Sequence, residues 1–303
     1  MSANPGSVLL LDEPDAHLEV LRQRQIYNEL TATAAETGSQ IIAASHSEVI
    51  LNEAADRDTV IAFVGRPHRI DDRGSQVLKS LKEIGFDQYL QAEETGWVLY
   101  LEGSTDLAVL RGFAEALDHP AREVLTRPFV HYVANQPARA RQHFYGLRAA
   151  KEDLKGIAIY DRLDIALNDD PNLVQLSWQR REIESYLCQK ETLLAWAHAF
   201  GCQQQGDLFA PTWVQAMEKA IADITQALTA LRESDPWGPD TKVSDDFLDP
   251  VFRKFFEKLN LPNQMAKTNY HTLVPYVPKD QIAPEVQEKL DRILEVANSA
   301  TNQ

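Results

Sequence analysis

The sequence predicts an α/β protein in which parallel strands alternate with helices. Short apolar runs recur along the chain, and each stops abruptly at polar or acidic residues. Stretches with helical periodicity separate these runs, which is the order that a parallel sheet with flanking helices requires. In residues 203–265 the helical period is strong and no strand pattern interrupts it, so a helical insertion is expected there.

Composition limits the classes of protein that the chain can belong to. With 303 residues, 44% of them hydrophobic, it can form two domains, or one domain with a large insertion. We expect no membrane association and a cytoplasmic location, because no apolar window is long enough for a span and no secretory signal precedes the first strand. Cys188 and Cys202 form no CxxC pair, which argues against structural zinc and predicts buried packing residues in a reducing compartment.

The net charge of −15 argues against constitutive high-affinity binding of nucleic acid or anionic membranes. It is compatible with carboxylates gathered at a site that works only when divalent cations fill it. An ordinary acidic, solubilising surface would have the same charge.

The first seventy residues contain a strand, a helix and a strand. Val8–Leu11 has the pattern of a buried parallel strand and ends at Asp12 and Glu13, and residues 18–35 are helical as far as Gly38. A second strand, residues 40–44, precedes the sequence Ser-His-Ser, and residues 59–65 predict a third strand. Polar residues at the carboxyl ends of such strands mark the edge at which doubly wound sheets bind ligands.

"LLLDEPDAHLE" followed by "IIAASHS" resembles the second half of an ABC-type ATPase domain. The resemblance implies that Asp12 holds the magnesium of ATP, that Glu13 polarises the attacking water, and that His46 lies near the terminal phosphate. No GxxxxGK[ST] phosphate loop occurs in the 303 residues. We therefore expect residues 1–70 to be the C-terminal part of an ATPase domain that binds ATP only with the missing part. Alternatively, Glu13 and His46 only end their strands.

Acidic residues follow three later strands, after a polar linker with a short helix at residues 71–96. Glu102 ends the strand "WVLYL", and Asp106 lies in the first turn of the next helix, which Ser104 or Thr105 caps. Because the carboxyl ends of parallel strands share one edge, the acidic residues are expected to converge on divalent cations. The set is Glu102, Asp106, Asp161, Asp164, Glu182 and Glu184. Alternatively, Asp106 serves only the helix dipole, and any other member is a solvated surface acid.

The strand-Glu-Gly start and the later acidic strand end resemble the Toprim domain, a Rossmann-like parallel sheet. With "REIESYL" and the ATPase-like segment, the chain resembles the OLD (overcoming lysogenization defect) family of ATPase-Toprim nucleases as far as about residue 200. The resemblance implies a Toprim domain at 97–202, an insertion at 203–265 and a C-terminal Toprim segment at 266–303. It implies two Mg²⁺ or Mn²⁺ ions held by the acidic set, with Glu102 and Lys267 catalytic and His271 near a phosphate. The usual Asp-x-Asp is one residue longer here, from Asp161 to Asp164.

Spacing alone leaves the lysine open, since Lys254, Lys258 and Lys279 lie near Lys267. Candidate contacts to DNA phosphates are basic residues on a predicted helix and before Glu182; alternatively they form a solvated face. They are Arg139, Arg141, Arg148, Arg180 and Arg181. The insertion's aromatic residues predict core packing rather than stacking on bases, and they are Trp213, Phe252, Phe255 and Phe256.

These patterns together predict a metal-dependent DNA endonuclease or nickase. In such a reaction one cation lowers the pKa of the attacking water and the other stabilises the leaving oxygen, while a lysine neutralises charge in the transition state. The family likeness further suggests a role in phage defence and homo-oligomers formed through the ATPase domain. One alternative is a regulatory or assembly module with a structural metal site. A Toprim primase or topoisomerase fragment is a third possibility, disfavoured because no zinc motif or catalytic tyrosine context is present.

Overall fold

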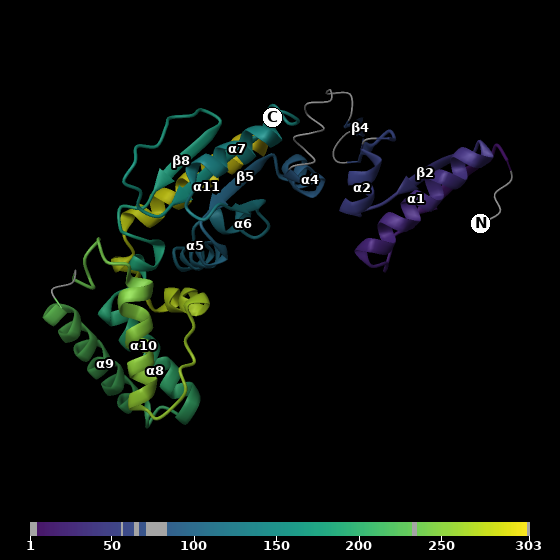
Figure 1. The fold of residues 1–303 in the computed structure, drawn as a ribbon. Coiled ribbons are helices and arrows are strands. Elements are labelled where there is room, and N and C mark those ends of the chain that lie inside the picture. The colour runs from purple at the N-terminus through teal and green to yellow at the C-terminus, as the bar shows by residue number, and fades with distance from the viewer. Residues whose placement is uncertain (1–4, 56, 64–66, 71–83, 232–234, 302–303) are drawn as a thin grey trace. The chain divides into compact units, whose positions relative to one another are not determined.

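The structure is a computed structural model that describes residues 5–55, 57–63, 67–70, 84–231 and 235–301. The chain divides into two compact units (Figure 1), residues 1–96 with 142–154 and residues 97–141 with 155–303. The class is mixed α/β, with parallel strands and flanking helices, as the sequence predicts. Parts of the expected third strand and of the linker, at 64–66 and 71–83, lie outside the described residues.

The first unit begins with a β-α-β arrangement. Strand β1 (Val8–Asp12) pairs in parallel with β2 (Gln40–Ala44), and helix α1 (Val20–Thr37) connects them. Gly38 ends α1 in the left-handed conformation, with φ of 61° and its N–H bonded to the Ala34 carbonyl. Helix α2 (Glu48–Ala54) follows, then the short antiparallel strands β3 (Ile61–Ala62) and β4 (His68–Arg69).

The first two strands are less buried than their apolar sequence predicts. The side chains of Val8, Leu10 and Ile42 are 60%, 76% and 54% exposed. Val8 and Leu10 alternate with half-buried residues along β1, and every residue of β2 except Ile41 is exposed, so this sheet is open among the described residues. The prediction of a fully buried strand is therefore wrong for this chain, because the described sheet has only two strands.

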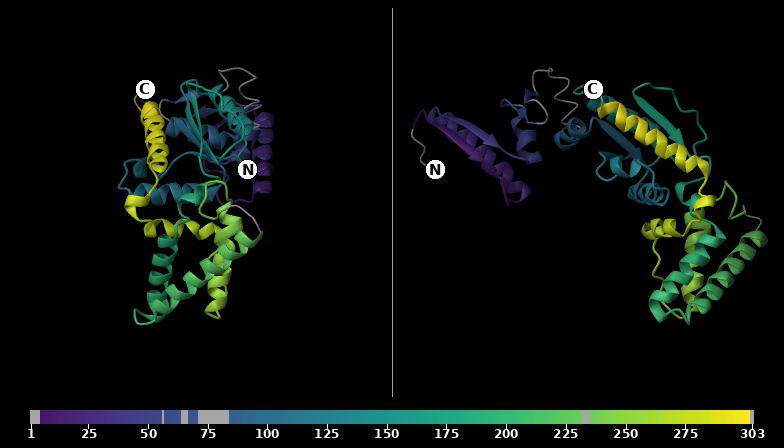
Figure 2. Two further views of the ribbon diagram at one scale, coloured as in Figure 1. Left: turned by 90° about the vertical axis from the view of Figure 1, so that its left-hand side faces the viewer. Right: turned by 180° about the vertical axis from the view of Figure 1, so that it is seen from behind.

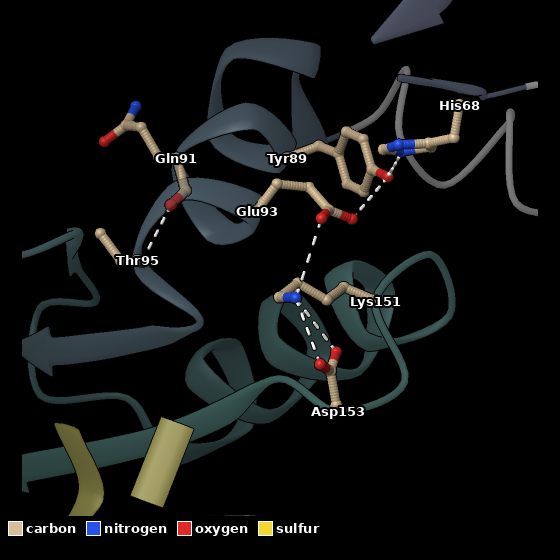
Figure 3. A network of polar contacts seen from close by, with 7 residues as sticks. All are labelled: His68, Tyr89, Gln91, Glu93, Thr95, Lys151 and Asp153. Carbon is tan, nitrogen blue, oxygen red and sulfur yellow. Dashed lines mark hydrogen bonds and ion pairs between the residues drawn. The ribbon is translucent and has the colours of Figure 1, made fainter. Parts of the chain in front are cut away.

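A polar network joins three segments of the first unit (Figure 3). Tyr89, on helix α4 (Phe86–Thr95), is 1% exposed, and its hydroxyl donates to Glu93 at 2.7 Å. The same oxygen lies 2.9 Å from Nε2 of His68, which is on β4. Lys151 Nζ lies 3.7 Å from Glu93 and 3.1 Å from Asp153. The network ties β4 and α4 to residues 151–153 of the same unit.

A four-stranded parallel sheet forms the centre of the second unit, in the order β6-β5-β7-β8. The strands are β5 (Trp97–Leu101), β6 (Val130–Tyr132), β7 (Lys155–Tyr160) and β8 (Leu173–Ser177). Every residue of β5 is buried, as expected for a parallel strand covered on both faces. Helix α11 (Pro284–Thr301) packs along β5 and β7 (Figure 1). The flanking helices α5 (Ser104–Ala116), α6 (Ala121–Val124) and α7 (Pro137–Arg148) lie between β5 and β7 in sequence.

A helical layer follows β8 and packs through aromatic side chains. Its helices are α8 (Lys190–Gln205), α9 (Ala210–Leu231), the π-helical turn η3 (Ser244–Leu248) and α10 (Asp249–Lys258). Helices α8, α9 and α10 lie side by side in both views (Figures 1 and 2). Trp196 of α8 packs 5.1 Å from Phe252 and 5.8 Å from Phe255, between ring centroids. The layer therefore begins at Lys190, earlier than residue 203.

Burial of the aromatic rings confirms the core-packing prediction. Trp213, Phe252, Phe255 and Phe256 are at most 1% exposed, so no base can stack on them. Cys188 is buried as expected, whereas Cys202 is only partly buried. The chain continues through the 3₁₀ segments η4 (Lys267–Tyr276) and η5 (Lys279–Gln281) to α11.

Candidate functional site

The carboxyl ends of neighbouring parallel strands carry the acidic residues of the second unit. Glu102 directly follows β5, Asp161 directly follows β7, and Glu184 lies in the 3₁₀ turn η2 (Ile183–Tyr186) after β8. Strand β7 pairs with both β5 and β8 in parallel, which brings these ends to one edge. Asp106, Asp161 and Glu184 lie close enough to Glu102 that its charge acts on the pKa of each of them. These four residues are called the carboxylate cluster below.

Asp106 has a local structural task as well as a place in the cluster. Its Oδ2 accepts hydrogen bonds from the backbone N–H groups of Glu102 at 3.0 Å and Gly103 at 3.4 Å, and the Thr105 hydroxyl donates to Oδ1 at 3.3 Å. It therefore caps the N-terminus of α5, as the alternative reading of this residue predicts. Burial and then the Glu102 charge raise its pKa to about 6, although these hydrogen bonds act in the opposite direction.

Two members of the carboxylate cluster favour the protonated form at neutral pH. The pKa of Asp161 is raised to about 9, first by burial, then by a hydrogen bond and charge from Glu102 and by the charges of Asp106 and Glu184. The pKa of Glu184 is raised to about 8, first by burial and then by Glu182. The largest influences on both groups are burial and other carboxyls, with no lysine or arginine among them. Such a set has unbalanced negative potential that a cation would neutralise.

The oxygen ligands of the carboxylate cluster are of the type that divalent cations bind, but their side chains are not arranged around one point. Among the residues that the structure describes, no group of three His, Cys, Asp or Glu side chains is arranged to hold a metal ion. All four members of the cluster offer carboxylate oxygens, the ligands that Mg²⁺ and Mn²⁺ prefer. Glu102 is the exposed member of the cluster, whereas Asp106, Asp161 and Glu184 are partly buried.

The remaining two acids of the predicted set are placed differently. Glu182 is 3% exposed, and its Oε1 and Oε2 accept from the Ser244 N–H at 2.5 Å and the Ser244 hydroxyl at 3.0 Å. Burial raises the pKa of Glu182, and the Ser244 bonds lower it. Asp164 is exposed and is not among the largest influences on the pKa values of the cluster. The structure thus brings four of the six predicted acids together, with Glu182 adjacent and bound to Ser244.

Lys267 begins η4 and forms an ion pair with Asp245. Asp245 also pairs with Lys242 at 2.7 Å. Tyr270, one turn beyond Lys267, donates to the Ser244 carbonyl at 3.5 Å, and its pKa is raised by burial and then by Asp249, Glu184 and Glu182. Tyr270 of η4 is therefore close enough to Glu184 and Glu182 for their charges to act on its pKa.

Other lysines near Lys267 in sequence have surface partners. Lys254 pairs with Glu257, and Lys258 pairs with Asp223 at 2.7 Å. Ser244 and Asp245 are site residues that the sequence interpretation missed. The only signal in the sequence is a pair of acids, Asp245 and Asp246, before an amphipathic helix, and that pattern also fits an ordinary helix start.

The basic residues proposed for DNA separate into two groups. Arg180 lies over the Tyr186 ring at 5.7 Å, and its Nη1 donates to the carbonyls of Ser185 and Trp237 at 3.5 and 3.3 Å, which gives it a structural role. Arg139, Arg141 and Arg181 are exposed, and Arg148 is half-buried. Burial raises the pKa of Tyr160 and the Arg141 charge opposes the shift, which places Arg141 near the end of β7. The His271 ring lies 3.0 Å from the Thr268 carbonyl.

The ATPase-like residues lie at the ends of β1 and β2. Asp12 is the last residue of β1, and Glu13 has φ of 43°, a conformation uncommon for residues other than glycine. The Glu13 N–H donates to the Ala44 carbonyl at 2.9 Å, which holds the turn to the end of β2. His46 Nε2 lies 3.8 Å from Glu13 Oε1, and both side chains are more than half exposed. The expected pair of polar strand ends is thus adjacent.

The N-terminal residues are similar to a known family. Residues 1–52 match the family described as "AAA domain, putative AbiEii toxin, Type IV TA system". The match supports an ATPase-type region over Asp12, Glu13 and His46. A search of curated proteins found no match to the chain. Within the described residues, no helix combines the length and apolar character needed to cross a membrane.

Proposed function

We propose that the chain is a divalent-metal-dependent endonuclease or nickase of DNA, with a Toprim-type site in its second unit and the organisation of OLD-family nucleases. The observation that carries the proposal is the carboxylate cluster at the ends of neighbouring parallel strands, where burial and like charges raise the pKa of Asp161 to about 9 and of Glu184 to about 8. Proteins place such unbalanced acids where a cation or a proton transfer needs them.

The residues have separate tasks in this proposal. Asp106 fixes the turn after β5 through its bonds to the backbone of Glu102 and Gly103, so Glu102 is presented at the sheet edge. Glu102, Asp161 and Glu184 then supply oxygens for two Mg²⁺ or Mn²⁺ ions. When bound, the cations supply charge stabilisation for the attacking and leaving oxygens of the phosphodiester. Lys267 would neutralise the negative charge that develops on the phosphate.

DNA is held by sequence-independent contacts in this account. Arg139, Arg141 and Arg181 are the exposed basic residues that could meet backbone phosphates, and Arg141 lies near the strand end that carries Asp161. Because the whole chain carries a net charge of −15, binding is expected to be weak without divalent cations and to weaken further with salt.

The N-terminal segment is proposed to couple this site to ATP. Asp12, Glu13 and His46 would act on the magnesium and terminal phosphate of a nucleotide in an ATPase that also mediates homo-oligomers. The match of residues 1–52 to an AAA domain supports this part of the proposal. A cytoplasmic role in phage defence accompanies the family likeness.

Cleavage of supercoiled plasmid tests the proposal. The purified chain is incubated with Mg²⁺, Mn²⁺, Ca²⁺ or EDTA, beside Glu102→Ala, Lys267→Ala and a control, Glu288→Ala, which removes an exposed acid of α11. Nicked or linear product that requires metal, is lost in the first two variants and persists in the control supports the nuclease. Metal binding without cleavage in any condition would favour the regulatory or assembly module.

A further inference from the structure

We propose that two consecutive residues of the segment from Pro239 to Leu248 position the groups of the site: Ser244 holds Glu182, and Asp245 holds Lys267. The inference rests on the proposed nuclease function, because it assigns Lys267 a place in that reaction. Asp245 is a positioning residue: it contacts the lysine and acts through it.

Ser244 fixes the acidic side of the site. Its backbone N–H and hydroxyl occupy both oxygens of Glu182, at 2.5 and 3.0 Å. Ser244 and Glu182 are 8% and 3% exposed, so water competes little for these bonds. Glu182 is the residue immediately before η2, and Glu184 of the carboxylate cluster lies in that turn. The Ser244 bonds therefore also hold the backbone that presents Glu184.

Asp245, the next residue, fixes the basic side. It pairs with Lys267 at the start of η4 and with Lys242 at 2.7 Å. A lysine side chain has several rotatable bonds and loses much of its freedom when a carboxylate holds its ammonium group. Consecutive residues of one turn thus make the contacts that set the acids and the lysine relative to each other.

The segment is also hydrogen-bonded to a third part of the site. Arg162, which directly follows Asp161, donates from Nη1 to Asp240 at 2.7 Å and to the Pro239 carbonyl at 3.3 Å. Arg181 N–H donates to the same carbonyl at 2.8 Å. The segment therefore contacts the residue after Asp161 and the residue before Glu182. The first of these contacts is made by Arg162, which lies between Asp161 and Asp164.

Local geometry supports a specific role for this turn. Residues 244–248 form a π-helix, a rare conformation that often occurs at functional sites. Phe247 and Leu248 are fully buried, and the Phe247 ring packs against Trp237 with centroids 5.0 Å apart. The side chains of Lys267 and Asp245 are 48% and 37% exposed, so their ion pair contributes little to overall stability. Loss of the pair should change the reaction and leave the melting temperature nearly unchanged.

The test compares Asp245→Asn with Asp246→Asn. Asp246 is the next residue; it is exposed, and its side chain makes no hydrogen bond or ion pair within the described residues. A displacement of about 1 Å can cost about 100-fold in rate. We expect Asp245→Asn to lower kcat for metal-dependent plasmid nicking about 10- to 100-fold, with KM for DNA and the metal midpoint within about twofold of wild type. Asp245→Glu should recover part of the loss, and Asp246→Asn should behave as wild type. An unchanged kcat in Asp245→Asn would overturn the inference.

A second readout does not depend on cleavage. An amine-reactive reagent labels Lys267 at pH 8, and mass spectrometry of the peptide that contains Lys267 follows the rate of labelling. Asp245→Asn should raise this rate several-fold, because the Lys267 amine is then no longer held in an ion pair and is more accessible to the reagent; Asp246→Asn should not. Unchanged labelling in Asp245→Asn overturns the inference alone. If labelling rises but wild-type protein binds metal without ever cleaving DNA, the nuclease proposal fails, and the catalytic meaning of the pair fails with it.

Discussion

Binding of a divalent cation at the carboxylate cluster should release protons. A cation displaces protons from its carboxylate ligands. The number of protons released follows from the pKa values, which are about 9 for Asp161, about 8 for Glu184 and about 6 for Asp106. At pH 7 the first two groups are protonated and the third is about one-tenth protonated, so about two protons are lost in total. Because the groups interact, this number belongs to the cluster and not to single residues.

Glu184→Gln is the variant that tests this count. The amide keeps the shape of the side chain but cannot exchange a proton, so release on Mn²⁺ binding at pH 7 should fall from about two protons to about one. Titration calorimetry in two buffers with different ionisation enthalpies measures the number directly. Glu288→Gln on the exposed face of α11 is the matched control. Equal proton release in wild type and Glu184→Gln, or none in either, would refute the reasoning.

Three further predictions concern stability. The folded-state pKa values of Asp161 and Glu184 are raised above the unfolded values of about 4, so their contribution to stability is full below pH 4 and is lost as pH rises through 8 and 9. Between those limits the free energy of unfolding of the metal-free protein should fall by about 1.4 kcal/mol per pH unit for each group that is protonated only in the folded state. Urea unfolding at a series of pH values measures this loss. A Cβ at Gly201 would lie 2.6 Å from the Trp213 ring, so Gly201→Ala should destabilise the helical layer by about 1–3 kcal/mol in thermal unfolding. Tyr89→Phe removes a buried hydroxyl bonded to two partners and should cost about 1 kcal/mol or more in the same assay.

Each of these has a matched control. Divalent cations at saturation should remove most of the pH dependence, because they replace the protons at the cluster. Gly103→Ala adds a Cβ whose nearest contact is 3.9 Å away, so it should change stability little. Tyr132→Phe, at a 44% exposed tyrosine, tests whether loss of a hydroxyl alone has an effect. Equal losses in a variant and its control would remove the structural explanation.

The parts of the site that the sequence predicts are those encoded locally. The buried run before Glu102 and the helix that follows it are determined by neighbouring residues, and parallel strands then bring Glu102, Asp161 and Glu184 to one edge. The cap formed by Asp106 is local as well, since its donors lie three and four residues away.

The parts that the sequence does not predict depend on contacts between distant residues. Ser244 and Glu182 are 62 positions apart, and no periodicity signals their bond. Glu182 directly precedes the 3₁₀ turn η2 and Glu184 lies in it, so only the structure distinguishes the acid bound to Ser244 from the acid in the cluster. Exposure of Leu10 on β1 likewise depends on which strands cover it, and a run of apolar residues alone cannot reveal that.

The most direct test of the central claim is anomalous diffraction from crystals soaked in Mn²⁺. The account predicts manganese peaks at the carboxyl edge of the β5-β7-β8 sheet, with oxygens of Glu102, Asp161 and Glu184 within about 2.3 Å. Manganese bound elsewhere, or no peak at this edge at millimolar concentration, would contradict it.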